Sequence, residues 1–524
     1  MGILLLTLLR PDTDRRARVK LPFYVSSFRI AGRRESADTL VDKIKEQLCL
    51  IVGAAEESWQ SFHNTGFVTD SPNVNRSART KLLSADVFSF AYGCTAHALS
   101  NLCRHIIKMP AVLRFVSFCS VLAKYFHNHH LPRAHLIKQQ QTETPQPPAQ
   151  KLSTPTRWTG TVCLLTSVLK NRGSITTVLF KAKQRVIDMD FPPSLFDLVM
   201  ENDDWDNVAQ WEPALYTFSA IINYLQADTT PLSGVYACFL SLEAYLVPSN
   251  FPLSIRDEIR GFIKLRYATI FSPAHVLSFY PDPVFVPFRE MSRASTVKPC
   301  TMTDAAVCMK AAKRLVRTAS EEEKVTVVMQ VTQLFMGSFP FLRTGAVEES
   351  SRVSLRHVWW SLHAEGAPPE LRAVAAQMFS LAPTSAAGER SFNQRSRVHS
   401  KTQNRLSDDH ANKTQAIIFS KRQTRRFYGS VLLQARTTCA EAHMVGMLRR
   451  SCPDGSGGGD GNTIAGGSQV DGVGGASGDG VLEQEVGEGE EEEALADEDV
   501  ETVAGAQEAV ARLIEKAEAE SKYT

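Results

Sequence analysis

No stretch of this sequence is apolar for long enough to cross a membrane, so we expect no membrane partner. The short apolar run Ile3–Leu9 has no basic residue before it and no clear cleavage site after it, which favours a buried strand over a signal peptide. The ten cysteines are scattered without a paired framework, a distribution typical of free thiols in a reducing compartment. No period of repeat length stands out either.

Charge is distributed unevenly along the 524 residues. Residues 451–524 hold 19 acidic and 3 basic side chains, a net charge of −16, whereas the first 450 residues hold 55 basic and 37 acidic ones, a net charge of +18. A basic body followed by an acidic tail favours a polyanionic partner, with the tail competing for the same surface. The length and the 43% hydrophobic content indicate a globular chain of two or three domains.

The first carboxylate of interest is Asp70. Residues 66–70 form a short β-prone run, and the helical pattern from Asn75 to Leu83 follows it. An acid at the carboxyl end of a strand in an α/β layer lies where such folds place their sites. The alternative is an Asx-turn, in which the side chain bonds the backbone two residues on.

Two further motifs carry polar side chains. Cys94 and His97 stand one helical turn apart, and Cys103 and His105 follow on the same predicted helix. A zinc site needs a clearer second pair, so we predict none, and buried thiols with a hydrogen-bonded histidine are the alternative. Trp158, directly after Arg157, is predicted to anchor a core or to stack on a base.

The stretch 382–392 is predicted to form a packed corner. Helical spacing in residues 373–381 ends where Pro383 bars its continuation, and small residues follow. Glu389 and Arg390 come next, at the start of a second helical pattern. The carboxylate of Glu389 is paired, metal-bound or at the edge of a cleft, and the simplest of these is a helix-start Glu in a salt bridge with a neighbour.

Several blocks of the sequence, taken in order, resemble the hAT (hobo–Activator) family of DNA transposases. The blocks are 68–75 (VTDSPNVN), 93–102 (GCTAHALSNL), 156–158 (TRW), 272–275 (SPAH), 282–283 (DP), 359–360 (WW), 369–372 (PELR), 384–392 (TSAAGERSF) and 404–406 (NRL). The order of the set carries the resemblance, which runs from about Pro22 to Arg426.

The resemblance implies a ribonuclease-H-like core in which three carboxylates hold two Mg²⁺ ions for phosphodiester transfer. It implies that Asp70 is the second acid and Glu389 the third. The residues that it implies at the DNA or in organising the site are Cys94, His97, Arg157, Trp158 and Arg390. The residues that it implies in a C-terminal dimerisation region are Trp359, Trp360, Leu371, Phe392 and Leu406.

The chain departs from the family at its N-terminal end. The family's first Asp lies on a strand upstream of the part that resembles Met1–Leu21, and Asp12 and Asp14 lie in a basic turn that does not match that motif. No Cys/His set with ligand spacing precedes Asp70, so a zinc-finger module is not recognised. We therefore expect an N-terminally truncated relative, in which loss of one acid lowers two-metal catalysis by orders of magnitude.

We predict a partial α/β ribonuclease-H-like core with a large all-α insertion, a helical C-terminal dimerisation region and a disordered acidic tail. The predicted divisions are residues 1–137 (partial core), 138–155 (linker), 156–345 (helical insertion), 346–427 (dimerisation region with the last core helix), 428–501 (tail) and 502–524 (short amphipathic helix).

The predicted function is that of a nuclear hAT transposase-derived protein that forms a homodimer or higher oligomer and binds DNA without catalysis. Two alternatives stay open at this point. One is an active transposase or nuclease that uses Mg²⁺, with Asp12 substituting for the first acid. The other is an interaction protein that acts through its acidic tail and last helix rather than through DNA.

Overall fold

The structure, a computed structural model, describes a chain that is mostly helical. The described residues are 2–9, 20–28, 36–52, 66–70, 72–143, 158–227, 230–246, 251–300, 302–316, 319–339, 360, 366–390, 413–414, 417–418 and 444–447. The strands are β1 (Gly2–Leu9), β2 (Lys20–Phe28), β3 (Gly66–Thr69) and β4 (Phe90–Gly93).

The helices follow the apolar spacing of the sequence. They are α1 (Ala37–Val52), α2 (Asn73–Ser84), α3 (Thr95–Lys108), α4 (Pro110–Asn128), α5 (His130–Glu143), α6 (Trp158–Lys170), α7 (Arg172–Lys183), α8 (Pro193–Met200), α9 (Asn202–Gln226), α10 (Ser233–Leu246), α11 (Leu253–Ile270), α12 (Pro273–Phe279), the 3-10 helix η2 (Pro283–Phe288), α13 (Arg289–Ala294), α14 (Asp304–Leu315), α15 (Glu321–Phe335) and α18 (Pro369–Ser380). The predicted large helical content is confirmed.

The strands form two separate sheets of two strands each. β1 and β2 pair antiparallel from Gly2↔Phe28 to Leu9↔Lys20. β3 and β4 pair parallel, with Thr69 opposite Gly93, so their carboxyl ends meet at one edge. The ribonuclease-H-like core stays a prediction, because the described strands do not form one larger sheet.

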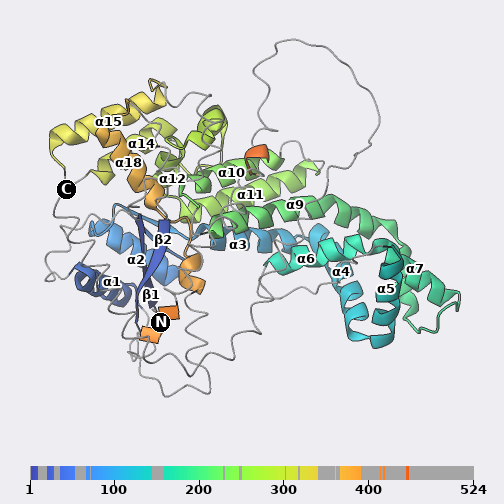
Figure 1. The fold of residues 1–524 in the computed structure, drawn as a ribbon. Coiled ribbons are helices and arrows are strands. Elements are labelled where there is room, and N and C mark those ends of the chain that lie inside the picture. Colours follow the sequence, from blue (N-terminus) through green and yellow to red (C-terminus); the bar gives the residue numbers. More distant parts are fainter. Residues whose placement is uncertain are drawn as a thin grey trace, which may run out of the picture.

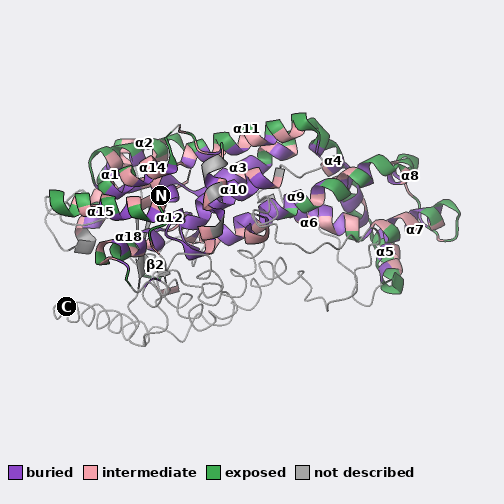
Figure 2. Ribbon diagram, turned by 90° about the horizontal axis from the view of Figure 1, so that it is seen from above, coloured by how far each residue is buried: buried purple, intermediate pink, exposed green. Residues whose placement is uncertain are grey.

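The described elements form an elongated body. The strands, α1, α2 and α15 lie towards one end and α4 to α8 towards the other, with α3, α9, α10 and α11 between them (Figure 1). Buried side chains run along the inner faces of these helices, and the exposed residues line their outer faces (Figure 2). No single described helix is long and apolar enough to cross a membrane; α3 and α4 reach that length only as a pair, which is bent by 87°.

The main hydrophobic cluster crosses the predicted division between core and insertion. It extends from Phe90 in β4 through α3 and α4 to the helices of the insertion. A second, smaller cluster lies between α1 and α2 and includes Ile44, Leu82 and Phe88. The described residues from β4 to α5 therefore share one cluster with the predicted insertion, because α3 packs directly on α9 and α11.

Two predicted boundaries differ from the structure. Residues 138–143, predicted to begin the linker, complete α5, where buried Gln140 donates to the side-chain oxygen of Asn171 at 2.6 Å. Residues 444–447, predicted to lie in the tail, form a helical turn in which Met444 and Met447 are buried. The thiol of Cys238 lies 3.3 Å from the sulfur of Met444 and belongs to the same cluster. Buried contacts hold both segments in place where composition alone indicated loops.

Two glycines provide a matched test of the packing between β4 and α11. A methyl group on Gly93 would lie 2.6 Å from Cγ2 of Ile270, whereas one on Gly261 of α11 would meet nothing within 4 Å. We expect Gly93→Ala to lower the free energy of unfolding by about 1–3 kcal/mol through overpacking. Gly261→Ala should raise it by about 0.5–1 kcal/mol, because alanine favours the helix. Chemical denaturation measures both, and equal effects would contradict the close approach of α11 to β4.

Candidate functional site

Asp70 lies at the carboxyl end of β3, beside the end of β4. The N–H of Cys94 donates to the carbonyl of Thr69 at 2.6 Å, which extends the parallel ladder by one bond. The two strand ends are therefore held together where Asp70 leaves the sheet. This edge is where an α/β layer presents polar side chains.

Two side chains of helix α2 donate hydrogen bonds to Asp70. Asn75 donates its amide to the Asp70 carboxylate, and Arg79 donates to the Asp70 carbonyl at 2.9 Å and to the Thr69 hydroxyl at 2.6 Å. Arg79 is only 6% exposed, and burial, with Arg76 nearby, lowers its pKa to about 10, although Asp70 and Cys94 act in the opposite direction. The Asx-turn alternative does not apply at the position two residues on, because Pro72 has no N–H. The carboxylate is instead oriented by Asn75.

Cys94 is the point where the strand ends meet the C-terminal part of the chain. Its sulfur accepts from the N–H of Ser385 at 3.3 Å, and it is fully buried. The N–H of Thr95 donates to the carbonyl of Pro383 at 3.3 Å, and the hydroxyl of Tyr92 donates to the carbonyl of Ala382 at 2.9 Å. Burial raises the pKa of the Cys94 thiol, and the charge of Glu389 raises it further. Asp70 and Glu389 therefore lie on segments that both contact Cys94.

The stretch around Glu389 forms the predicted packed corner. α18 ends at Ser380, and Leu381, Thr384 and Ala386 are buried. A short helical segment, 386–390, then places Glu389 at an exposed position, where its N–H donates to the carbonyl of Ser385 at 3.1 Å. Arg390 donates to the carbonyl of Gln226 at 3.3 Å, so it ties this segment to α9.

The thiols and imidazoles around α3 do not form a metal cluster. Cys103 is buried, and burial raises its thiol pKa well above the usual range. A guanidinium nitrogen of Arg266 lies 2.6 Å from Nε2 of His105, and His97 lines an open cavity. Among the residues that the structure describes, no three His, Cys, Asp or Glu side chains come together in a way that could hold a metal ion. A Mg²⁺ site at Asp70 and Glu389, which the resemblance implies, stays a prediction.

The predicted dimer residues are only partly described. Trp360 is 3% exposed and donates its indole N–H to the carbonyl of Pro281 at 2.9 Å, and Leu371 is 1% exposed. Both side chains belong to the main hydrophobic cluster, and a part in dimerisation stays a prediction. Trp359, Phe392 and Leu406 lie outside the described residues, as do Arg157 and the side chain of Trp158, so stacking on a base stays a prediction as well.

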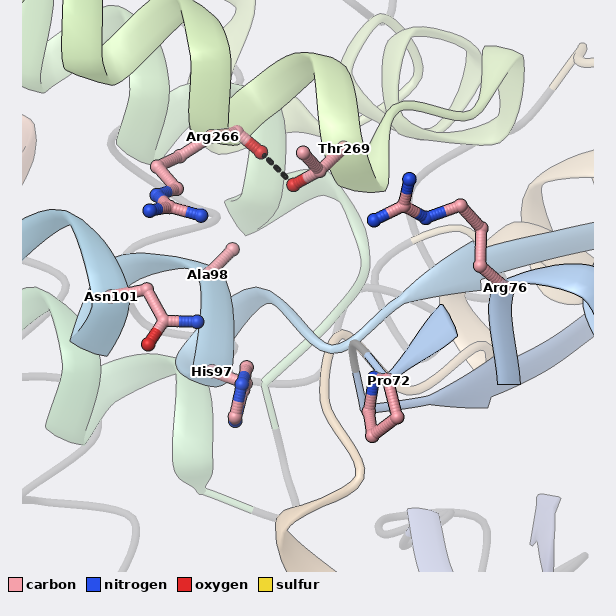
Figure 3. Close-up of a pocket in the computed structure, with 7 residues that line it drawn as sticks. All are labelled: Pro72, Arg76, His97, Ala98, Asn101, Arg266 and Thr269. Atoms are coloured by element: carbon pink, nitrogen blue, oxygen red, sulfur yellow. Dashed lines mark hydrogen bonds between the residues drawn. The ribbon is translucent and has the colours of Figure 1, made fainter. Parts of the chain in front are cut away.

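A cavity of about 340 Å³ lies beside this site and was not predicted from the sequence. It is lined by Pro72 and Arg76 at the start of α2, by His97, Ala98 and Asn101 of α3, and by Arg266 and Thr269 of α11. The two guanidinium groups approach the hollow from opposite sides (Figure 3). Sequence reasoning missed Arg79 because nothing local distinguishes a buried arginine from an exposed one. It missed Arg266 because only the fold brings α11 to α2.

Comparison with known proteins identifies one segment of the chain. Residues 352–423 match the model of the hAT family C-terminal dimerisation region. No curated protein matches the chain. The match covers α18 and the packed corner with Glu389, and it confirms the hAT resemblance for this C-terminal part. The resemblance of the N-terminal part stays a prediction.

Proposed function

We propose that this protein is derived from a hAT transposase and acts as a DNA-binding homodimer that does not cleave its DNA. The observation that carries the proposal is the contact of the segment 382–390 with the carboxyl end of β4. That segment lies within the matched dimerisation region, and it contacts Tyr92, Cys94 and Thr95 through one hydrogen bond each. The matched region and the Asp70 site therefore form one structural unit.

The charge of the chain supports DNA as the partner. The first 450 residues carry a net charge of +18, which favours binding to a polyanion. The proposed protein does not cleave because Asp70 and Glu389 are two of the three acids that the resemblance implies for two-metal chemistry.

The test uses the full chain. We expect light scattering to report a dimer, and fluorescence anisotropy to report binding to duplex DNA that weakens by about 10³–10⁵ between 50 and 200 mM salt if six to ten phosphates are contacted. If the full chain is a monomer and shows no salt-dependent affinity for DNA, the proposal is wrong. Removing residues 451–524 should preserve or strengthen DNA binding, because that segment carries a net charge of −16.

A second candidate function, metal-dependent phosphodiester transfer, is favoured by the approach of the Asp70 and Glu389 segments to Cys94. Incubation of the full chain with labelled duplex DNA and Mg²⁺ or Mn²⁺ distinguishes it from the first. Cleavage that disappears in both Asp70→Asn and Glu389→Gln would replace our proposal with this one. An intact substrate is the result we expect.

A further inference from the structure

Two arginines, Arg76 and Arg266, line the cavity near Asp70. None of the seven residues that line it is acidic. Among the described residues, no carboxylate forms an ion pair with Arg76 or Arg266. Arg76 is exposed at the start of α2, whereas Nε of Arg266 is buried and has no hydrogen-bond partner. Two guanidinium groups that have no described carboxylate partner and line one hollow favour the binding of an anion.

The helices add further positive potential at the same place. α2 and α3 begin beside the cavity, at Asn73 and Thr95, and neither helix start has a side-chain cap that bonds its first N–H groups. Helix N-termini carry a partial positive charge and favour anions. The Asn101 amide oxygen accepts from Arg104 at 3.3 Å, and its NH₂ group points towards the hollow (Figure 3). The lining therefore offers donors from three helices.

Arg266 is held in position by α3. One of its guanidinium nitrogens lies 2.6 Å from Nε2 of His105, and the carbonyl of Arg266 accepts from the Thr269 hydroxyl at 2.7 Å. Burial lowers the pKa of His105, and the charges of Arg266 and Lys108 lower it further. The neutral ring can accept from Arg266 and leaves its other guanidinium N–H groups directed at the cavity.

We propose that this cavity binds a phosphate group of a DNA strand that passes over the carboxyl ends of β3 and β4. The inference rests on the proposed function and adds the place where the backbone is held. A single guanidinium group can donate two parallel N–H bonds to phosphate oxygens. The cavity volume of about 340 Å³ falls within the size range of ligand sites. Because Pro72 and Arg76 line the cavity at the start of α2, the bound phosphate lies at the N-terminal end of that helix, close to the end of β3.

The experiment compares full-length variants by fluorescence anisotropy with a labelled 20-nucleotide single strand and its duplex. We expect Arg76→Ala and Arg266→Ala each to weaken binding about tenfold and to lower the slope of log affinity against log salt by about 0.7–0.9. Arg76→Lys should keep the salt slope and lose part of the affinity, because lysine retains the charge without the fork. Arg266→Lys serves as the second variant if Arg266→Ala unfolds when His105 loses its partner.

Arg133→Ala is the matched control. Arg133 is an exposed arginine on α5, at the other end of the body from the cavity (Figure 1), and its loss should change affinity by less than about twofold. If the wild type binds DNA and the cavity variants bind equally well, the phosphate site is wrong and the proposed function stands. If the wild type binds no DNA, the proposed function fails.

A measurement with inorganic phosphate tests whether the cavity binds a phosphate group of DNA or a free phosphate ion. We expect the wild type to be stabilised against heat only slightly by millimolar phosphate and to prefer the oligonucleotide strongly, because a single phosphate lacks the rest of the chain. Strong stabilisation by phosphate that Arg76→Ala abolishes, without any DNA affinity, would overturn the assignment to DNA and leave a site for a free phosphate.

Discussion

Replacing Lys298 with methionine is expected to lower the free energy of unfolding by about 3–5 kcal/mol, since the change leaves a buried carboxylate without its cation. Lys298 and Asp304 form an ion pair in which their side chains are 11% and 3% exposed. Asp304 also accepts from the Tyr280 hydroxyl at 2.9 Å and the Ser292 hydroxyl at 3.0 Å. These neutral donors orient the carboxylate but do not compensate its charge. Chemical denaturation of the full chain measures the loss.

Two variants test the cause of that loss. Adding Asp304→Asn to Lys298→Met should recover part of the stability, because an amide in the same place needs no counter-charge. Lys310→Met, an exposed change on the same helix α14, should stay within about 0.5 kcal/mol of wild type. A loss of less than about 1 kcal/mol in Lys298→Met would show that Asp304 is not held in a dry environment.

Acid is expected to destabilise the protein through His275. This side chain is fully buried, and burial lowers its pKa from 6.5 to about 3. Nδ1 accepts from the N–H of Ser272 at 3.4 Å, and Nε2 is buried without a partner. The ring lies between Tyr92 and Tyr267, at centroid distances of 5.2 and 5.9 Å. The folded state therefore keeps this imidazole neutral.

The direction of the pH effect follows from which state binds the proton. Between about pH 6.5 and pH 3, the unfolded chain is protonated at His275 and the folded chain is not. Stability contributed by the neutral ring is complete above pH 6.5 and falls by about 1.4 kcal/mol per pH unit as the pH is lowered through this range. His275→Gln, which retains an acceptor for the Ser272 N–H, should remove that slope.

The test compares the slope of the free energy of unfolding against pH between the wild type and His275→Gln, because other groups also titrate in this range. Denaturation at several pH values between 7.5 and 4 gives the free energy of unfolding of each variant. His130→Gln, at an exposed position in α5, should leave the wild-type slope unchanged. An equal acid slope in wild type and His275→Gln would mean that His275 is protonated in the folded protein.

Local patterns in the sequence predicted several of the described elements. The helical patterns of residues 75–83 and 373–381 predicted α2 and α18, and Pro383 marked the limit of α18, because apolar periodicity and proline act over a few residues. The same reasoning placed Asp70 at a strand end, as the structure confirms. It failed at residues 138–143 and 444–447, where polar or weak patterns are held in place by distant partners such as Asn171 and Cys238.

The site was predictable only in part, for a related reason. Asp70, Cys94 and Glu389 could be selected because each belongs to a block that resembles the hAT family, and the structure brings their segments together. Arg266 belongs to none of these blocks, and its meeting with Arg76 depends on how α11 packs on α3. Such pairs require tertiary structure, because no short-range spacing in the chain encodes them.

The hydrogen bond between Tyr92 and Ala382 can form only late in synthesis of the chain, because its two residues are far apart in the sequence. Its two residues are 290 positions apart, and Cys94 and Gly66 meet partners in the same late segment, Ser385 and Leu381. At a synthesis rate of roughly 5–20 residues per second, about 15–60 s pass between the emergence of β4 and the emergence of residues 381–385, which contact it. During that interval the edge that bears Asp70 is open on the nascent chain. The strand ends therefore gain their contacts with residues 381–385 only after the helices that lie between them in the sequence have been made.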